Sequence, residues 1–213
     1  MKIFLLIIIG QIATFVVAQT NPQVVVPTFN DSYSQTVKQL EAGQTDINYK
    51  EFRESFIESK QFKIASKSFM RLDSLKKQMY ESMNEKDYPT LIKITKQILS
   101  IDYTNMLAHK ILRQTYKIVG DTINAAKYKT IQFGLLKSIT KNGDGKTCQT
   151  AWPVIQIEEE YFILDMLGAT LKKQSIDNEG GLCDKMEVTT DKGKKTYYFE
   201  TTKVFEGYKK TEN

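Results

Sequence analysis

The chain has 213 residues, with 30 Lys and Arg against 25 Asp and Glu and a formal net charge of +5 at pH 7. The basic residues are spread among acidic and aromatic ones, without the dense one-sided cluster that neutralises nucleic-acid phosphates, so we expect no nucleic-acid partner. A chain of this length can bury a core of its own, as one large domain or two small ones.

The first residues are typical of a secretory signal peptide. Lys2 precedes an apolar run over residues 3–9, and cleavage after Ala18 would make residues 1–18 the signal peptide. The apolar run is too short for a stable membrane anchor, because the hydrocarbon core of a bilayer is about 30 Å thick. We therefore expect an extracytoplasmic protein, periplasmic or secreted, with no integral membrane segment after cleavage; a retained signal anchor is the alternative.

Residues 19–30 are predicted to form an extended linker, because two prolines flank a β-branched run. Residues 31–140 then combine N-cap residues, apolar side chains at helical spacing and C-terminal glycines, which predicts a helical-hairpin region. The expected helices cover residues 33–43, 47–59, 69–87, 88–102, 105–120 and 121–139.

A weak internal repeat supports a stack of hairpins. Asp87 and Asp121 each begin a predicted helix and stand 34 residues apart, which is the period of the tetratricopeptide repeat. Ala108, Leu112 and Tyr116 match the small and aromatic positions of that repeat in part. We interpret this likeness as structural rather than as a sign of peptide capture in a concave face.

Residues 141–207 are predicted to form a small α+β region packed on the helices, followed by a tail over 208–213. Alternating, β-branched and aromatic segments predict strands at 152–158, 170–177, 186–191 and 195–206, with one short helix at 158–168. The predicted fold class is therefore α+β: a stack of antiparallel, tetratricopeptide-like helical hairpins followed by a small, mainly antiparallel sheet with one short helix.

The stretch KNGDGKT, residues 141–147, looks most like a chemical motif. A phosphate loop would require glycine where Thr140 stands, and a calcium loop in this register would end on Ala151 instead of a carboxylate. The remaining interpretation is a structural turn made of Asn142, Gly143, Asp144 and Gly145.

Two cysteines, Cys148 and Cys183, occur in the whole chain. In an oxidising compartment they most simply pair with each other, closing a loop of about 35 residues. A metal site is not supported, because His109 is the sole histidine and lies in another region. We predict a disulfide and expect no metal or cofactor.

Candidate catalytic side chains are few. His109 has no assignable nucleophile beside it and is interpreted as a packing residue. The glutamates 158–160, together with Asp165 or Asp184, resemble paired glycosidase carboxylates, but three consecutive acids more often favour a helix dipole. Seven aromatics offer a sugar-binding surface or a core, and core is the expectation: Trp152, Tyr161, Tyr197, Tyr198, Phe199, Phe205 and Tyr208. We expect no catalytic residues.

Four segments resemble the exported bacterial family catalogued as domain of unknown function 4919. They are 40–59, 142–168, 182–188 and 196–206, within a match over about residues 27–207. The resemblance implies a signal peptide, tetratricopeptide-like hairpins, a small β-containing end and a Bacteroidetes-type envelope location. It carries no established activity, so no catalytic residues are implied. Pro153 departs from the expected pattern.

The expected function is that of a non-enzymatic interaction or structural module of the cell envelope, with a protein partner. One alternative is a hydrolase acting on envelope or host glycans through clustered carboxylates; another is a small-ligand carrier with an apolar cavity between the two halves. An enzyme should bring two carboxylates about 5 to 10 Å apart in a cleft. A module should show dispersed acids and an exposed apolar patch.

Overall fold

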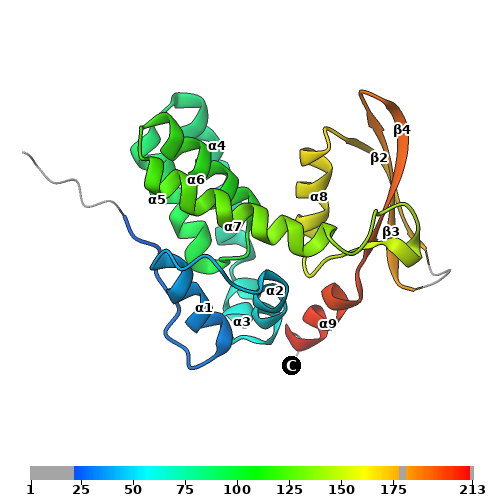
Figure 1. The fold of residues 1–213 in the computed structure, drawn as a ribbon, viewed down its shortest axis with the longest axis horizontal. Helices are drawn as coiled ribbons and strands as arrows, with labels where there is room; N and C mark the ends of the chain where they lie inside the picture. The colour runs from blue at the N-terminus through cyan, green and yellow to red at the C-terminus, as the bar shows by residue number, and fades with distance from the viewer. Residues whose placement is uncertain (1–21, 178–180, 212–213) are drawn as a thin grey trace, which may run out of the picture.

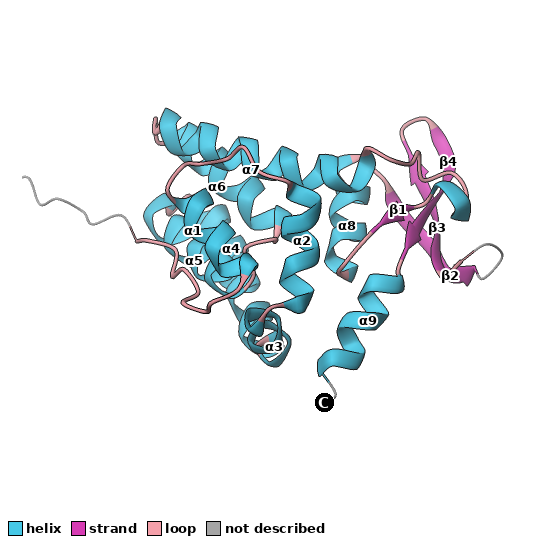
Figure 2. Ribbon diagram, turned by 60° about the horizontal axis from the view of Figure 1, so that its bottom comes forward, coloured by secondary structure: helices cyan, strands magenta, loops and turns pink. Residues whose placement is uncertain are grey.

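The computed structural model describes residues 22–177 and 181–211, so the predicted signal peptide lies outside the described residues. Figures 1 and 2 show a helical stack on one side, a sheet on the other, and α8 between them. The helices of the stack are α1 Ser32–Glu41, α2 Tyr49–Glu58, α3 Lys60–Lys67, α4 Phe69–Glu85, α5 Tyr88–Ile101, α6 Met106–Ile118 and α7 Thr122–Thr140. No helix in the described part of the chain is long and apolar enough to cross a membrane.

Polar caps set where several helices begin. Asp31, Asn48 and Asn105 accept hydrogen bonds from first-turn amides of α1, α2 and α6. Asp87 and Asp121 do the same for α5 and α7. Such side chains satisfy N–H groups that have no partner within the helix. The two aspartates spaced 34 residues apart therefore lie at the turns of two hairpins, α4–α5 and α6–α7.

One hydrophobic core joins the helices to the sheet. Buried apolar residues form a single cluster that extends from Val24, before α1, to Val204, after the last strand. Aromatic rings fill the helical end of it, where Tyr33 stacks on Phe52 with centroids 5.4 Å apart. The cluster includes residues of both the helices and the strands. Ile123, in the first turn of α7, lies outside this core and is 83% exposed.

The sheet is mixed, with strand order β1-β4-β3-β2. The strands are β1 Trp152–Pro153, β2 Thr170–Asp177, β3 Cys183–Thr190 and β4 Gly193–Glu200. β2, β3 and β4 pair antiparallel, whereas β1 pairs parallel to β4. The predicted strand over 152–158 is wrong beyond its first two residues, because the chain turns into α8, Ile157–Met166, which begins where the consecutive glutamates favour a helix N-terminus.

A second helix in this half, α9 (Thr202–Thr211), was not predicted. The sequence pattern indicated a strand to residue 206 and a tail from 208, and both expectations are wrong, because β4 ends at Glu200 and α9 follows. Val204 is buried, and a Cβ on Gly207 would lie 3.0 Å from the ring of Phe62 in α3. Lys210 forms an ion pair with Glu58 of α2. Packing against α2 and α3 therefore overrides the strand propensity of this segment.

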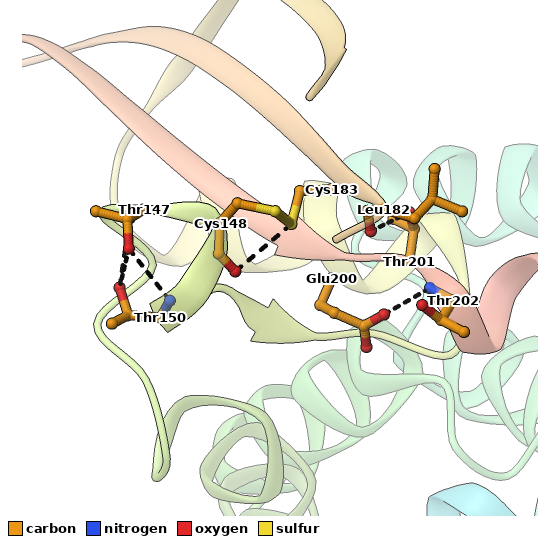
Figure 3. Close-up of a disulfide and its surroundings, with 8 residues drawn as sticks. All are labelled: Thr147, Cys148, Thr150, Leu182, Cys183, Glu200, Thr201 and Thr202. Carbon is orange, nitrogen blue, oxygen red and sulfur yellow. Dashed lines mark hydrogen bonds between the residues drawn. A yellow bond between two sulfur atoms is a disulfide. The ribbon is translucent and has the colours of Figure 1, made fainter. Parts of the chain in front are cut away.

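The predicted disulfide is present: Cys148 and Cys183 are bonded, joining the short 3-10 turn Cys148–Thr150 to the start of β3 (Figure 3). The turn residues 142–145 lead into it. The Asp144 carboxylate accepts hydrogen bonds from the Lys146 amide and the Thr150 hydroxyl. Gly145 has φ +66°, and a Cβ there would lie 2.8 Å from the Trp152 ring, so only glycine fits.

Candidate functional site

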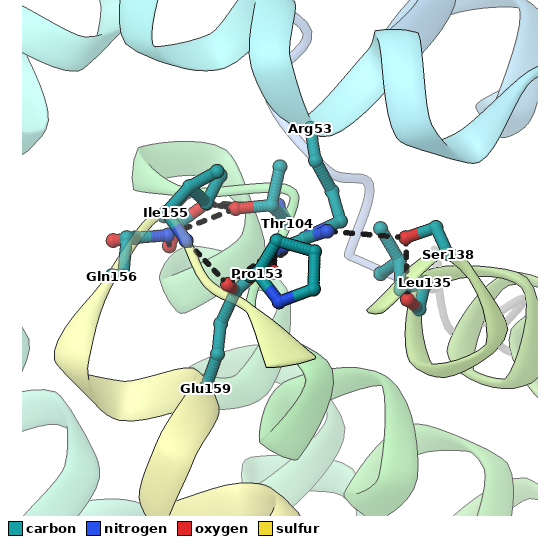
Figure 4. Close-up of polar contacts among 9 residues, drawn as sticks. Arg53, Thr104, Leu135, Ser138, Pro153, Ile155, Gln156 and Glu159 are labelled. Carbon is teal, nitrogen blue, oxygen red and sulfur yellow. Dashed lines mark hydrogen bonds and ion pairs between the residues drawn. The ribbon is translucent and has the colours of Figure 1, made fainter. Parts of the chain in front are cut away.

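Glu159 is held in a buried ion pair with Arg53 (Figure 4). Arg53 Nε and Nη2 donate to the two carboxylate oxygens at 2.8 and 2.5 Å, and Nη2 also donates to the Pro153 carbonyl at 3.2 Å. The Ile155 amide donates to Glu159 Oε2 at 2.8 Å. Bidentate pairs of this kind fix geometry, so Glu159 joins α8 to α2 and is not available to a substrate.

The exposed acids of α8 pair with lysines on two other helices. The Nζ atom of Lys76 in α4 lies 3.5 Å from Glu158 Oε1. The Nζ atom of Lys110 in α6 lies 2.6 Å from Asp165 Oδ2. Three of the carboxylates that the sequence grouped as glycosidase-like therefore have separate cationic partners, whereas a fourth, Glu160, lies near Asp184. Glu158, Glu159 and Asp165 line one hollow beside α8, but each is held by its own cation.

Glu160 lies in a third environment, fully buried near Asp184 of β3. Neither of its carboxylate oxygens has a hydrogen-bond partner in the described structure. Burial, and after it the charges of Asp184 and Glu159, raise the pKa of Glu160 to about 8. Glu160 is therefore mostly a neutral acid at pH 7.

We expect Glu160→Gln to remove a pH dependence of stability. The pKa rises from 4.5 in the unfolded chain to about 8 in the folded one, so the unfolded state ionises first and stability falls as pH rises through this interval. Relative to wild type, the free energy of unfolding of the variant should increase by about 2 kcal/mol when the pH is raised from 5 to 8. One pKa unit corresponds to about 1.4 kcal/mol, and water entry reduces the full effect. Denaturant unfolding at both pH values measures the gain.

Glu158→Gln is the matched control, because this glutamate is on the same helix and is exposed. It should leave the pH dependence as in wild type. An equal gain in both variants, or none in Glu160→Gln, would contradict a buried neutral acid at position 160.

His109 is a buried packing residue, as interpreted from the sequence. Its Nε2 lies 2.7 Å from the Tyr103 carbonyl oxygen, and its ring packs against Tyr103 and Tyr128. Burial lowers the pKa of His109 to about 4, so the ring is neutral at pH 7. His109 does not line the hollows beside α8 or the one beside α7.

Two adjoining hollows surround the start of α8, and we call them together the α8 groove. Their volumes are about 580 and 540 Å³. They share Asp102, Gln156, Glu158 and Tyr161. The first lies between α8 and the helices α4 and α6, and the second between α8, α3 and α9. The groove thus follows the seam between the helical stack and the rest of the fold.

A satisfied polar network forms the floor of the α8 groove where the hollows meet. Asp102 accepts hydrogen bonds from the amide and hydroxyl of Thr104 at 2.8 and 2.6 Å, and from Gln156 Nε2 at 3.1 Å. Burial raises the pKa of Asp102 to about 6, although these hydrogen bonds oppose the rise. These hydrogen bonds hold the floor of the groove in one arrangement, and the apolar walls are the surfaces that a bound segment would contact.

Large apolar side chains are exposed along the walls of the α8 groove. Phe69 is 70% exposed and Tyr208 is 52% exposed. The others that are exposed and line it are Tyr80, Met83 and Tyr161. The groove could not be predicted from the sequence, because helical periodicity does not show which apolar residues stay uncovered.

The remaining predicted aromatics divide between the core and the surface. Trp152 stacks on Tyr197 with centroids 5.4 Å apart and also packs on Phe199, so these three belong to the core side of the sheet. Phe205 and Tyr208 are exposed on α9, and Tyr198 is half-buried. Tyr208 and Tyr161 both line the second hollow of the α8 groove, and the Tyr161 hydroxyl donates to Gln174.

No group of three or more His, Cys, Asp or Glu side chains within residues 22–177 and 181–211 is placed to hold a metal ion. A comparison with protein families matched residues 28–210 to the family described as Domain of unknown function (DUF4919). The comparisons with curated proteins and with solved structures found no match. Because the family match spans most of the 213 residues, the chain belongs to this family.

Proposed function

We propose that the protein is a non-enzymatic interaction module that binds an apolar segment of a protein partner in the α8 groove. The observation that carries the proposal is the gathering of exposed large apolar side chains along two adjoining hollows. Contiguous apolar surface of this kind is a feature of protein interaction sites. The polar floor at Asp102 gives the groove a fixed shape and orients a bound segment.

The ion pairing of the α8 acids supports a module over a glycan hydrolase. Each acid of α8 that lines the groove has its own cation: Glu158 has Lys76, Glu159 has Arg53, and Asp165 has Lys110. Glu160, the one with a strongly raised pKa, is not part of the groove lining. A glycosidase requires two carboxyl groups facing one bond, one protonated and one ionised.

The proposed location is extracytoplasmic, in the cell envelope or outside the cell. The Cys148–Cys183 disulfide supports it, since such bonds persist in oxidising compartments. The signal-peptide pattern of residues 1–18 supports it independently.

Site-specific photocrosslinking in cells of the source organism tests the proposal. A photoreactive amino acid at position 69 or 83, one in each hollow, should crosslink to the same partner protein. The matched control is position 123 on α7, where the native isoleucine is more exposed than either and lines neither hollow. We expect no crosslink to that partner from position 123.

A blocking substitution makes the result specific. Met83→Asp should abolish the crosslink from position 69, because a charge in one hollow disrupts a segment that occupies both. Equal crosslinking from positions 69 and 123 would contradict the proposed groove. Hydrolysis of purified envelope glycan that Glu158→Gln abolishes would instead favour the enzyme.

A further inference from the structure

A second groove lies on another part of the helical stack, between the loop before α2 and the outer side of α7. Its volume is about 840 Å³. The first wall is residues 45–50, which lead into α2. The second wall is α7 from Ala126 onward, continued by Lys141 and the turn residue Asn142 directly after the helix. None of these residues lines the α8 groove, and we call this second one the basic groove.

The α7 wall consists of two neighbouring rows of side chains, each with a spacing of four residues. One row is Lys129, Phe133, Lys137 and Lys141, and the other is Ala126, Thr130, Gly134, Ser138 and Asn142. Residues four apart in a helix lie on one face, so each row runs along the helix axis. The side chains of the second row are short and leave space above the helix. The lysines of the first row lie along the edge of that space.

Aromatic rings form part of the floor. The ring of Tyr49 packs directly on α7 at Gly134, where a Cβ would lie 2.3 Å from a ring carbon. The Tyr49 hydroxyl donates to the Thr45 carbonyl at 2.9 Å, which holds the ring in place. Phe133, in the lysine row, also lines the groove and is half-buried, with the Arg113 guanidinium carbon 5.4 Å from its ring centroid. The groove thus offers two partly exposed rings between cationic side chains.

The charges of the basic groove are strongly one-sided. Four lysines line it against a single acid, Asp46. Lys50 Nζ lies 3.9 Å from Glu54 Oε1, and a surface ion pair of this kind contributes little to stability. The α7 lysines at 129, 137 and 141 make no ion pair with another described residue. Their charge is therefore available to an anionic ligand.

We propose that the basic groove binds an acidic glycan, a chain of sugars that carry carboxylate or sulfate groups. Lysines pair with such anions, and the C–H face of a sugar ring packs on aromatic rings such as Tyr49 and Phe133. The Thr130 hydroxyl donates to the Ala126 carbonyl and can still accept from a sugar hydroxyl, and the Asn142 amide supplies both a donor and an acceptor. The disulfide favours a glycan over a nucleic acid, because it indicates an oxidising, extracytoplasmic setting. The proposal is independent of the α8 groove.

Binding of polygalacturonate to the purified protein tests this proposal. Wild type should bind it, more weakly as ionic strength rises, and should not bind neutral dextran. Lys129→Glu/Lys137→Glu/Lys141→Glu should bind about tenfold more weakly or worse, because three attractive contacts become repulsive. The matched control is Lys172→Glu/Lys192→Glu/Lys194→Glu, which changes net charge equally on exposed residues of the strand half. It should stay within about twofold of wild type.

A further variant separates sugar recognition from simple charge attraction. Phe133→Ser should weaken binding of polygalacturonate and leave binding of polyglutamate unchanged, with thermal unfolding confirming that the variant folds. Equal losses in the two triple variants would overturn the site. Single-stranded DNA or polyglutamate binding as tightly as polygalacturonate would overturn the assignment to a glycan.

Discussion

Replacing Arg53 by methionine is expected to destabilise the fold by about 3 to 5 kcal/mol, the cost of leaving a buried charge without its partner. The side chains of Arg53 and Glu159 are only 3% and 4% exposed, so water cannot replace the lost contacts. Arg53 also donates to the Pro153 carbonyl, which would lose this donor. Denaturant unfolding at pH 7 measures the loss.

The double variant Arg53→Met/Glu159→Met should recover a large part of that stability, since removing both charges is less costly than removing one. Lys110→Met is the surface control: its pair with Asp165 is partly exposed, so the change should be below about 1 kcal/mol. An equal effect of Arg53→Met and Lys110→Met would contradict the buried pair as the main link between α2 and α8.

The second large effect is expected from Cys148→Ser/Cys183→Ser, which should lower the free energy of unfolding by about 3 to 4 kcal/mol in the chain-entropy estimate for a loop of this length. The bonded residues are 35 apart in the sequence and tie the turn after α7 to β3. Without the bond, the unfolded chain gains freedom. Unfolding of wild type and variant under non-reducing conditions measures the difference.

Reductant provides the control for the disulfide. It should lower the stability of wild type towards that of the double variant and leave the variant unchanged. If intact-mass measurement after alkylation shows that both thiols of unreduced wild type react, the disulfide is absent and the expected difference disappears.

Helix starts and the overall class followed from local patterns. The caps at Asp31, Asp87 and Asp121, and the strand over residues 170–177, depend on residues close in sequence, and the structure confirms them. α9 was missed because its aromatic and β-branched residues favour a strand, and only contact with distant helices makes them helical.

The two grooves had different sequence signals. The basic groove has a signal that can be recognised in the sequence once the structure is known, namely lysines at four-residue spacing around Phe133. The α8 groove leaves none, since its walls come from α3, α4, α6, α8 and α9. Which apolar residues stay exposed depends on how these helices pack, and periodicity within one helix carries no such information.

Residues near each other in the chain were therefore enough to establish the α+β class and most helices, whereas the cysteine pairing followed from there being two cysteines in the chain. The consecutive glutamates show what such local patterns could not establish. Glu158 is exposed beside Lys76, Glu159 pairs with buried Arg53, and Glu160 is buried as a neutral acid. Burial and the charges brought near by folding set the state of each carboxyl group, and both arise only when distant segments pack together.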